Sequence, residues 1–289
     1  MTPDELAERR CRVLVDADGL AEQLAGPRPP VLLDVRWALG DPAGLAHHLA
    51  GHLPGAVWVD LETELAAPPS PADGRHPLPA LDDLQAAARR WGICQDSAVV
   101  AYDATGGLAA ARAWWLLRWA GHDQVRLLDG GLAGWVNGGY PVATGPTAPP
   151  VPGDVELTGG QLATLDAGQA ADLADRGMLL DARAGARYRG ELEPVDRRAG
   201  HVPGARSAPT TDNLDPDGRF ADARQLGERF AALGLPGAPV GVYCGSGVTA
   251  AHEVAALATL GIDAALYPGS WSAWSLDPAR PVATGAHPG

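Results

Sequence analysis

Short apolar runs alternate with longer amphipathic segments along the whole chain. The runs "VLLDV" (31–35), "AVVAYD" (98–103) and "QVRLLDG" (124–130) are continuous and rich in valine and leucine, which predicts strands buried on both faces of a sheet. The segments "LDDLQAAARRWG" (81–92) and "LAAARAWWLLRWAG" (108–121) have the apolar spacing of helices and end at glycine. Strands that alternate with helices of this length predict an α/β fold, with parallel sheets flanked by helices on both faces.

The pattern of the first half returns in the second half. Five matches occur in the same order: "PVLLDVRW" (30–37) with "MLLDARAGARY" (178–188), "GHLPGAVWVDLE" (51–62) with "GHVPGARSAPTT" (200–211), "AVVAYDATGG" (98–107) with "PVGVYCGSGV" (239–248), "LLDGGLAGW" (127–135) with "LYPGSWSAW" (266–274), and "YPVATG" (140–145) with "RPVATG" (280–285). Repeated order at a nearly constant separation indicates a duplicated domain. We predict domains at 1–145 and 158–289, joined by a proline-rich linker at 146–157.

Composition narrows the function classes. The chain has 289 residues, a net charge of −13 and no apolar run near the length of a membrane span, so we expect a soluble protein that binds neither nucleic acid nor membrane. The N-terminus lacks the apolar core of a signal peptide, and three scattered cysteines suggest neither a disulfide framework nor a metal site, which predicts a cytoplasmic location. All the basic residues are arginine, which excludes Schiff-base chemistry by lysine.

The stretch "VYCGSGVTAAHE" (242–253) carries the strongest chemical signal. Cys244 follows a strand-like run and precedes a helix-like segment. It therefore lies just beyond the carboxyl end of a strand, where α/β proteins bind ligands. Gly245 and Gly247 allow the backbone to turn its N–H groups inward, and the helix N-terminus adds partial positive charge. These surroundings favour a thiolate and stabilise an anion beside it. The first copy has Asp103 at this position, so only the second copy is expected to be catalytic.

The duplicated "LLDxR … GHxPGA … YCGSGVTA … GSWSAW" pattern resembles the two-domain rhodanese-type sulfurtransferases over essentially the whole chain. The resemblance implies two tandem rhodanese-like domains and no cofactor or metal. Within that family the loop "CGSGVT", which includes Val248 and Thr249, resembles the substrate-binding loop of 3-mercaptopyruvate sulfurtransferases. Thiosulfate-using relatives tend to have a basic residue in the loop, so the neutral Gly245–Ser246–Gly247 favours 3-mercaptopyruvate, with thiosulfate as the alternative donor.

The resemblance also assigns further site residues. Arg187 matches the arginine that binds the donor carboxylate, and Arg197 is the nearest equivalent of a second one, although the segment that follows it is shorter here. Ser246, His76 and an acidic residue correspond to a relay that handles the donor's proton. The acidic position is Glu62 where the family has aspartate, and Asp60 is a possible substitute.

The resulting hypothesis is a sulfurtransferase that forms a Cys244 persulfide and passes the sulfur to a thiol such as thioredoxin, or to cyanide, as a monomer. Two other classes fit the sequence less well. A C-x5-R phosphatase needs an arginine six residues after the cysteine, and this position is Ala250. A non-catalytic binding module is a common fate of duplicated domains, but the retained Cys244, Ser246, Thr249 and Arg187 argue against it.

Overall fold

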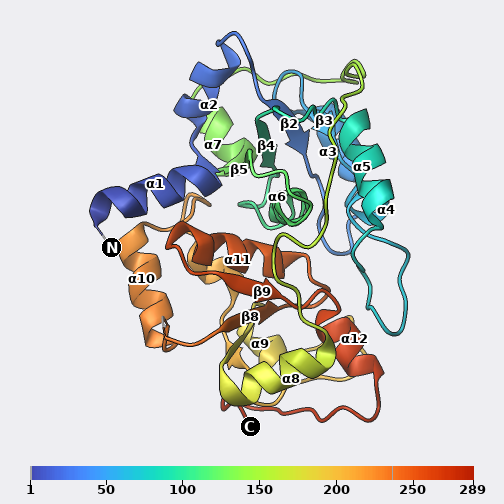
Figure 1. Ribbon diagram of the computed structural model, residues 1–289, viewed down its shortest axis with the longest axis vertical. Coiled ribbons are helices and arrows are strands. Elements are labelled where there is room, and N and C mark those ends of the chain that lie inside the picture. The colour runs from blue at the N-terminus through green and yellow to red at the C-terminus, as the bar shows by residue number, and fades with distance from the viewer. Residues whose placement is uncertain (1, 236) are drawn as a thin grey trace. The chain divides into compact units, whose positions relative to one another are not determined.

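The computed structural model describes residues 2–235 and 237–289, which form two compact units (Figure 1). Unit 1 contains residues 2–67, 79–162 and 215–220, and unit 2 contains 68–78, 163–214, 221–235 and 237–289. Each unit therefore includes a short segment that sequence order alone would place in the other. The segment 68–78 of unit 2 is important because it carries one of the predicted catalytic residues, His76.

Unit 1 is built on a parallel sheet of five strands in the order β1-β5-β4-β2-β3. Its strands are β1 (Leu14–Val15), β2 (Val31–Asp34), β3 (Val57–Trp58), β4 (Val99–Tyr102) and β5 (Val125–Leu128). Its helices are α1 (Pro3–Val13), α2 (Ala17–Leu24), α3 (Gly44–Ala50), α4 (Leu61–Glu64), α5 (Leu81–Arg90), α6 (Ala110–Trp119) and α7 (Gly131–Asn137). The strands and helices predicted between residues 31 and 130 are confirmed.

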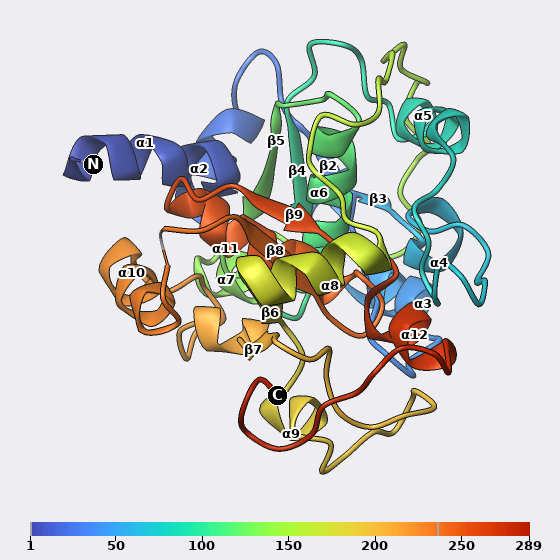
Figure 2. The same ribbon diagram turned by 60° about the horizontal axis from the view of Figure 1, so that its bottom comes forward.

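Unit 2 repeats this plan with a parallel sheet of four strands in the order β7-β6-β8-β9. Its strands are β6 (Met178–Asp181), β7 (Arg206–Ser207), β8 (Val240–Tyr243) and β9 (Ala264–Leu266). Its helices are α8 (Ala167–Arg176), α9 (Gly185–Tyr188), the 3-10 turn η1 (Thr210–Asn213), α10 (Ala223–Ala232), α11 (Thr249–Thr259) and α12 (Ser270–Leu276). Helix α8 packs on the face that carries Leu179 and Tyr243, and α11 lies on the opposite face (Figure 2).

The duplication extends to register and hydrogen bonding. Asp34 is paired with Tyr102 in unit 1 just as Asp181 is paired with Tyr243 in unit 2. Each buried tyrosine hydroxyl accepts a hydrogen bond from the backbone N–H that follows a "GH" pair, Leu53 in the first copy and Val202 in the second. The fold is therefore α/β with two related parallel sheets, as predicted.

The proline-rich segment predicted as a linker lies along unit 1 as extended chain. The N–H of Gly153 donates to the carbonyl of Arg89, and the N–H of Val155 donates to that of Ile93. Val155 is fully buried, so the end of this segment is held by packing as well as by backbone hydrogen bonds. No helix in the described residues is long and apolar enough to span a membrane.

Candidate active site

Cys244 lies at the carboxyl end of the central strand β8, directly before the loop that leads into α11. All four residues of β8 are buried, so the position of the cysteine is fixed by the core beneath it. Only 2% of Cys244 is exposed, which limits its reaction partners to small molecules or to an extended group that reaches into the site.

The start of α12 holds the backbone of the cysteine loop in place. The N–H groups of Trp271 and Ser272 donate to the carbonyls of Cys244 and Gly245, at 3.0 and 2.9 Å, and the Ser270 hydroxyl accepts from the Cys244 N–H. Ser270 has a left-handed backbone conformation, with a φ of 52°, and its hydroxyl also donates to the Tyr267 carbonyl at 2.9 Å. On the other side of the loop, the backbone N–H of Gly247 donates to Cys244 Sγ at 3.2 Å.

The first copy shows what this kind of loop binds. The carboxylate of Asp103, at the position of Cys244, accepts four backbone hydrogen bonds of 2.7 to 3.0 Å. The donors are the N–H groups of Thr105, Gly107, Ala109 and Ala110. In unit 1 this loop thus forms an anion-binding ring of amides around the protein's own carboxylate.

Two predicted relay residues meet beside the nucleophile loop. His76 Nδ1 and Ser246 Oγ are 2.7 Å apart, and both residues are more than nine-tenths buried. His76 reaches this position because the segment 68–78 is packed into unit 2. A serine hydrogen-bonded to an imidazole can take up or release a proton, which is the chemistry that a relay needs.

Gly74 allows the segment 68–78 to approach α12. Its φ is +85°, and a Cβ atom there would lie 2.4 Å from Ser272 Oγ and 2.7 Å from the carbonyl oxygen of Gly269. The next residue, Arg75, donates its backbone N–H to the same Ser272 hydroxyl at 3.1 Å. The close approach of these two chain segments therefore sets the positions of Arg75 and His76.

We expect Gly74→Ala to lower turnover by about tenfold, because the methyl group must push the segment away from α12 and displace His76. Gly285→Ala is the matched control, since Gly285 has a φ of +87° but open space at its Cβ position, and that variant carries only the backbone penalty of about 1–2 kcal/mol. Steady-state kinetics and thermal unfolding of both variants measure the difference. Equal turnover in the two variants would contradict the positioning role.

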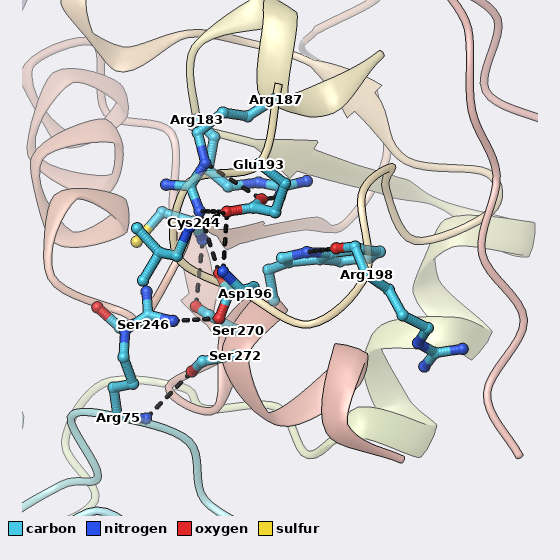
Figure 3. A network of polar contacts seen from close by, with 12 residues as sticks. Arg75, Arg183, Arg187, Glu193, Asp196, Arg198, Cys244, Ser246, Ser270 and Ser272 are labelled. Atoms are coloured by element: carbon cyan, nitrogen blue, oxygen red, sulfur yellow. Dashed lines mark hydrogen bonds and ion pairs between the residues drawn. The ribbon is translucent and has the colours of Figure 1, made fainter. Parts of the chain in front are cut away.

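A connected series of alternating arginines and carboxylates lies beside the loop (Figure 3). Arg187, on α9, pairs with Glu193 at 2.6 Å and with Asp196 at 3.0 Å. Arg75 pairs with the other oxygen of Asp196. Arg183 is 3% exposed and pairs with Asp181 and Glu193, as expected of a structural ion pair at a strand end.

The two carboxylates that bind Arg187 differ in their electrostatics. Burial raises the pKa of Asp196 above its ordinary value, although the charges of Arg75 and Arg187 oppose this shift. Burial also acts to raise the pKa of Glu193, but hydrogen bonds from Arg187 and from the backbone outweigh it and leave that pKa lowered. Glu193 therefore holds its negative charge beside Arg187 more strongly than Asp196, which is the more easily protonated of the two carboxylates.

The remaining predicted residues lie in several places. Gly247, with a φ of +77°, Val248 and Thr249 complete the loop and begin α11. Glu62 lies on α4 in unit 1, where it accepts from the Trp37 indole at 2.7 Å, so its role toward His76 stays a prediction. Arg197 is exposed and forms no ion pair among the described residues, and its contact with substrate also stays a prediction.

Arg75, Glu193 and Asp196 were not predicted from the sequence. The only local signal for Arg75 is that it precedes His76 in "DGRHPLP". Among the residues that the structure describes, no group of three or more metal-ligating side chains is placed to hold a metal ion.

Comparisons with known proteins identify the family. The model of the rhodanese-like domain matches the chain twice, over residues 16–138 and 166–277. This chain belongs to the rhodanese family. It is a sulfurtransferase with two rhodanese domains, and its relatives include both donor types.

Two bacterial relatives have the same sequence identity to this chain. A Mycobacterium tuberculosis protein named as a putative thiosulfate sulfurtransferase, SseB, is 48% identical over 96% of this chain and 99% of its own. A Pseudomonas aeruginosa protein named as a probable 3-mercaptopyruvate sulfurtransferase is 48% identical over 94% of this chain and 98% of its own. The crystal structure of the 3-mercaptopyruvate sulfurtransferase SseA of Escherichia coli superposes with a TM-score of 0.78 at 34% identity, covering 90% of this chain and 98% of that one.

Proposed function

We propose that this sulfurtransferase transfers sulfur from 3-mercaptopyruvate, through a persulfide on Cys244, to a thiol acceptor such as thioredoxin or to cyanide. The observation that carries the donor choice is the 2.7 Å contact between His76 and Ser246 beside the nucleophile. The thiol of 3-mercaptopyruvate carries a proton that must leave the sulfur and reach the carbon of pyruvate. Thiosulfate has no such proton, and its reaction needs no relay.

The proposed reaction has two steps. The Cys244 thiolate attacks the sulfur of 3-mercaptopyruvate, the C–S bond breaks toward carbon, and the thiol proton passes through Ser246 and His76 to the carbon, which gives pyruvate. The new Cys244 persulfide carries a negative charge on its outer sulfur, which the ring of N–H groups stabilises, as the homologous loop does for Asp103. The acceptor then attacks the outer sulfur and restores the thiolate.

The carboxylate of the donor is proposed to bind Arg187. One of its terminal nitrogens, Nη1, has no hydrogen-bond partner among the described residues and would lie 3.3 Å from a Cβ atom at Gly245. Guanidinium groups bind carboxylates with paired, charge-assisted hydrogen bonds. The free Nη1 beside Gly245 supports the proposal that Arg187 orients the donor with its sulfur toward Cys244.

Thiosulfate remains the second candidate donor, and one observation favours it. The loop itself is neutral, but two guanidinium groups, those of Arg75 and Arg187, lie against Gly245. Positive charge delivered from outside the loop suits a dianion as well as a carboxylate.

Replacing Ser246 with alanine distinguishes the two donors. We expect Ser246→Ala to lower kcat with 3-mercaptopyruvate about 10²-fold, the usual scale of general acid–base catalysis. With thiosulfate and the same acceptor, kcat should fall by about threefold at most, because no proton is transferred from that donor. The wild-type protein should also have the higher kcat/KM with 3-mercaptopyruvate. A wild-type preference for thiosulfate, or equal losses with both donors in Ser246→Ala, would overturn the donor proposal.

A further inference from the structure

We infer that Arg75 is a second anion-binding residue of the donor site and acts together with Arg187. This inference rests on the proposed function and extends it, because it assigns the donor's anionic group to a pair of arginines from two distant segments of the chain. The anion is a carboxylate in 3-mercaptopyruvate and a sulfonate-like group in thiosulfate. The shared chemistry is a compact oxyanion next to the transferred sulfur.

The first observation is where the two guanidinium groups converge. A Cβ atom at Gly245 would lie 3.1 Å from Arg75 Nη2 and 3.3 Å from Arg187 Nη1. Gly245 directly follows the nucleophile, and neighbouring Cα atoms are only about 3.8 Å apart. The ends of both arginines therefore lie within the length of a small donor from Cys244, in the space that a side chain in the loop would otherwise occupy.

The second observation is that each arginine has a guanidinium N–H group near Gly245 that forms no hydrogen bond among the described residues. Arg75 uses Nη1 for Asp196, whereas its buried Nε and its Nη2 have no hydrogen-bond partner in the part of the chain that the structure describes. Arg187 uses Nε and Nη2 for carboxylates and leaves Nη1 without a partner among the same residues. The carboxylates thus bind one part of each guanidinium group (Figure 3). The nitrogens without a partner, Arg75 Nη2 and Arg187 Nη1, are the ones nearest to Gly245.

The third observation concerns how Arg75 is held. Its backbone N–H is fixed by Ser272, whose own N–H binds the Gly245 carbonyl. A single serine at the start of α12 therefore ties the loop and the segment 68–78 together. Arg197, which the family resemblance suggested as the second substrate arginine, is exposed and forms no ion pair in the described part of the chain.

An alternative role for Arg75 is purely structural, as a tether that binds the segment 68–78 to the 191–200 loop through Asp196. The two roles make opposite predictions for Asp196→Asn. If Arg75 is a tether, Arg75→Gln and Asp196→Asn break the same bond and must act in the same direction. If Arg75 binds the donor anion, removing the charge of Asp196 removes a competitor and strengthens anion binding, whereas removing Arg75 weakens it.

The test uses two alkylating reagents of nearly equal size, without any sulfur donor. Iodoacetate carries a carboxylate and iodoacetamide is its neutral analogue, so the ratio of their rates at Cys244 reports positive charge next to the thiol. We expect Arg75→Gln to lower the iodoacetate-to-iodoacetamide ratio on the order of tenfold, Asp196→Asn to raise it, and Arg75→Lys to restore part of it. Arg176→Gln, which alters an exposed ion pair on α8, is the control and should leave the ratio unchanged.

Kinetics with each donor provides the second measurement. Arg75→Gln should raise KM about tenfold with a much smaller change in kcat, and the donor that loses more identifies the anion that the pair binds best. An unchanged alkylation ratio in Arg75→Gln, or shifts in the same direction in Arg75→Gln and Asp196→Asn, would overturn the inference. The alkylation ratio is measured without a sulfur donor, so it does not depend on persulfide formation. A failure of the proposed sulfur transfer would appear separately, as the absence of sulfur on Cys244 after the donor is added.

Discussion

Replacing Cys244 with serine is expected to lower sulfur transfer by at least about 10³-fold with every donor, the scale of loss that follows removal of a covalent nucleophile. A hydroxyl is a much weaker nucleophile than a thiolate and cannot hold a transferable sulfur. The fold should be unaffected, since the side chains are similar in size and Cys244 forms no disulfide. Steady-state assays with 3-mercaptopyruvate and with thiosulfate measure the loss.

Cys11→Ser is the matched control for this experiment. Cys11 is exposed on α1 in unit 1, and nothing in the described structure places it near an anion-binding loop. Turnover by Cys11→Ser should equal that of the wild type. Retained activity in Cys244→Ser would show that another group carries the sulfur and would end the assignment of the nucleophile.

The second large effect is expected from Arg187→Gln. A charge-assisted hydrogen bond contributes about 1.5–3 kcal/mol, and each 1.4 kcal/mol corresponds to about a tenfold change in binding. We therefore expect kcat/KM with 3-mercaptopyruvate to fall by about 10²-fold, mostly through KM. Arg187→Lys should recover only part of the loss, because an ammonium group cannot form the paired hydrogen bonds of a guanidinium.

Arg189→Gln separates the loss of substrate binding from a general effect of losing an arginine. Arg189 is two residues away, on the exposed side, and pairs only with Glu191 among the described charged side chains. Its substitution should leave kcat/KM unchanged. Since Arg187→Gln also deprives Glu193 and Asp196 of a cation, thermal unfolding must accompany the kinetics. Equal kcat/KM in both variants would contradict a substrate-binding role for Arg187.

The sheets and the nucleophile loop could be predicted from the sequence because their signals are local. Continuous apolar runs indicated β2, β4, β5 and β8, and glycines marked the ends of α5 and α6. The duplicated motifs predicted two copies of one plan, and both sheets have the same register at Asp34 and Asp181. The order of strand, cysteine, glycine loop and helix was enough to place Cys244 at the carboxyl end of a sheet strand.

The surroundings of the nucleophile could not be predicted in the same way. Arg75 contacts Asp196, 121 residues away, and Ser272, 197 residues away, and neither contact leaves a pattern in the sequence. Strand β1 has only two residues, too short for a periodicity to be recognised. The left-handed conformation of Ser270 was also unexpected, because the contacts of its hydroxyl with the Cys244 N–H and the Tyr267 carbonyl leave no pattern in the sequence.

The first copy is the clearest evidence for how the second copy works. Its loop holds a carboxylate with four N–H groups, so the backbone alone supplies four hydrogen bonds to an anion in that place. In unit 2 the same position is a thiol, and the arginines lie further out, at Gly245. This arrangement separates two anions during the proposed reaction: the amide ring stabilises the persulfide, and Arg75 and Arg187 bind the donor.

Whether Cys244 carries the transferred sulfur can be measured by mass spectrometry. The protein is treated with a stoichiometric amount of 3-mercaptopyruvate without acceptor, digested, and analysed under non-reducing conditions. We expect one added sulfur atom on the peptide that contains Cys244 and none on the peptides with Cys11 or Cys94. The added sulfur should be lost when cyanide or a thiol is added. Pyruvate release without any sulfur on Cys244, or sulfur on another cysteine, would contradict the role of Cys244 as the sulfur carrier.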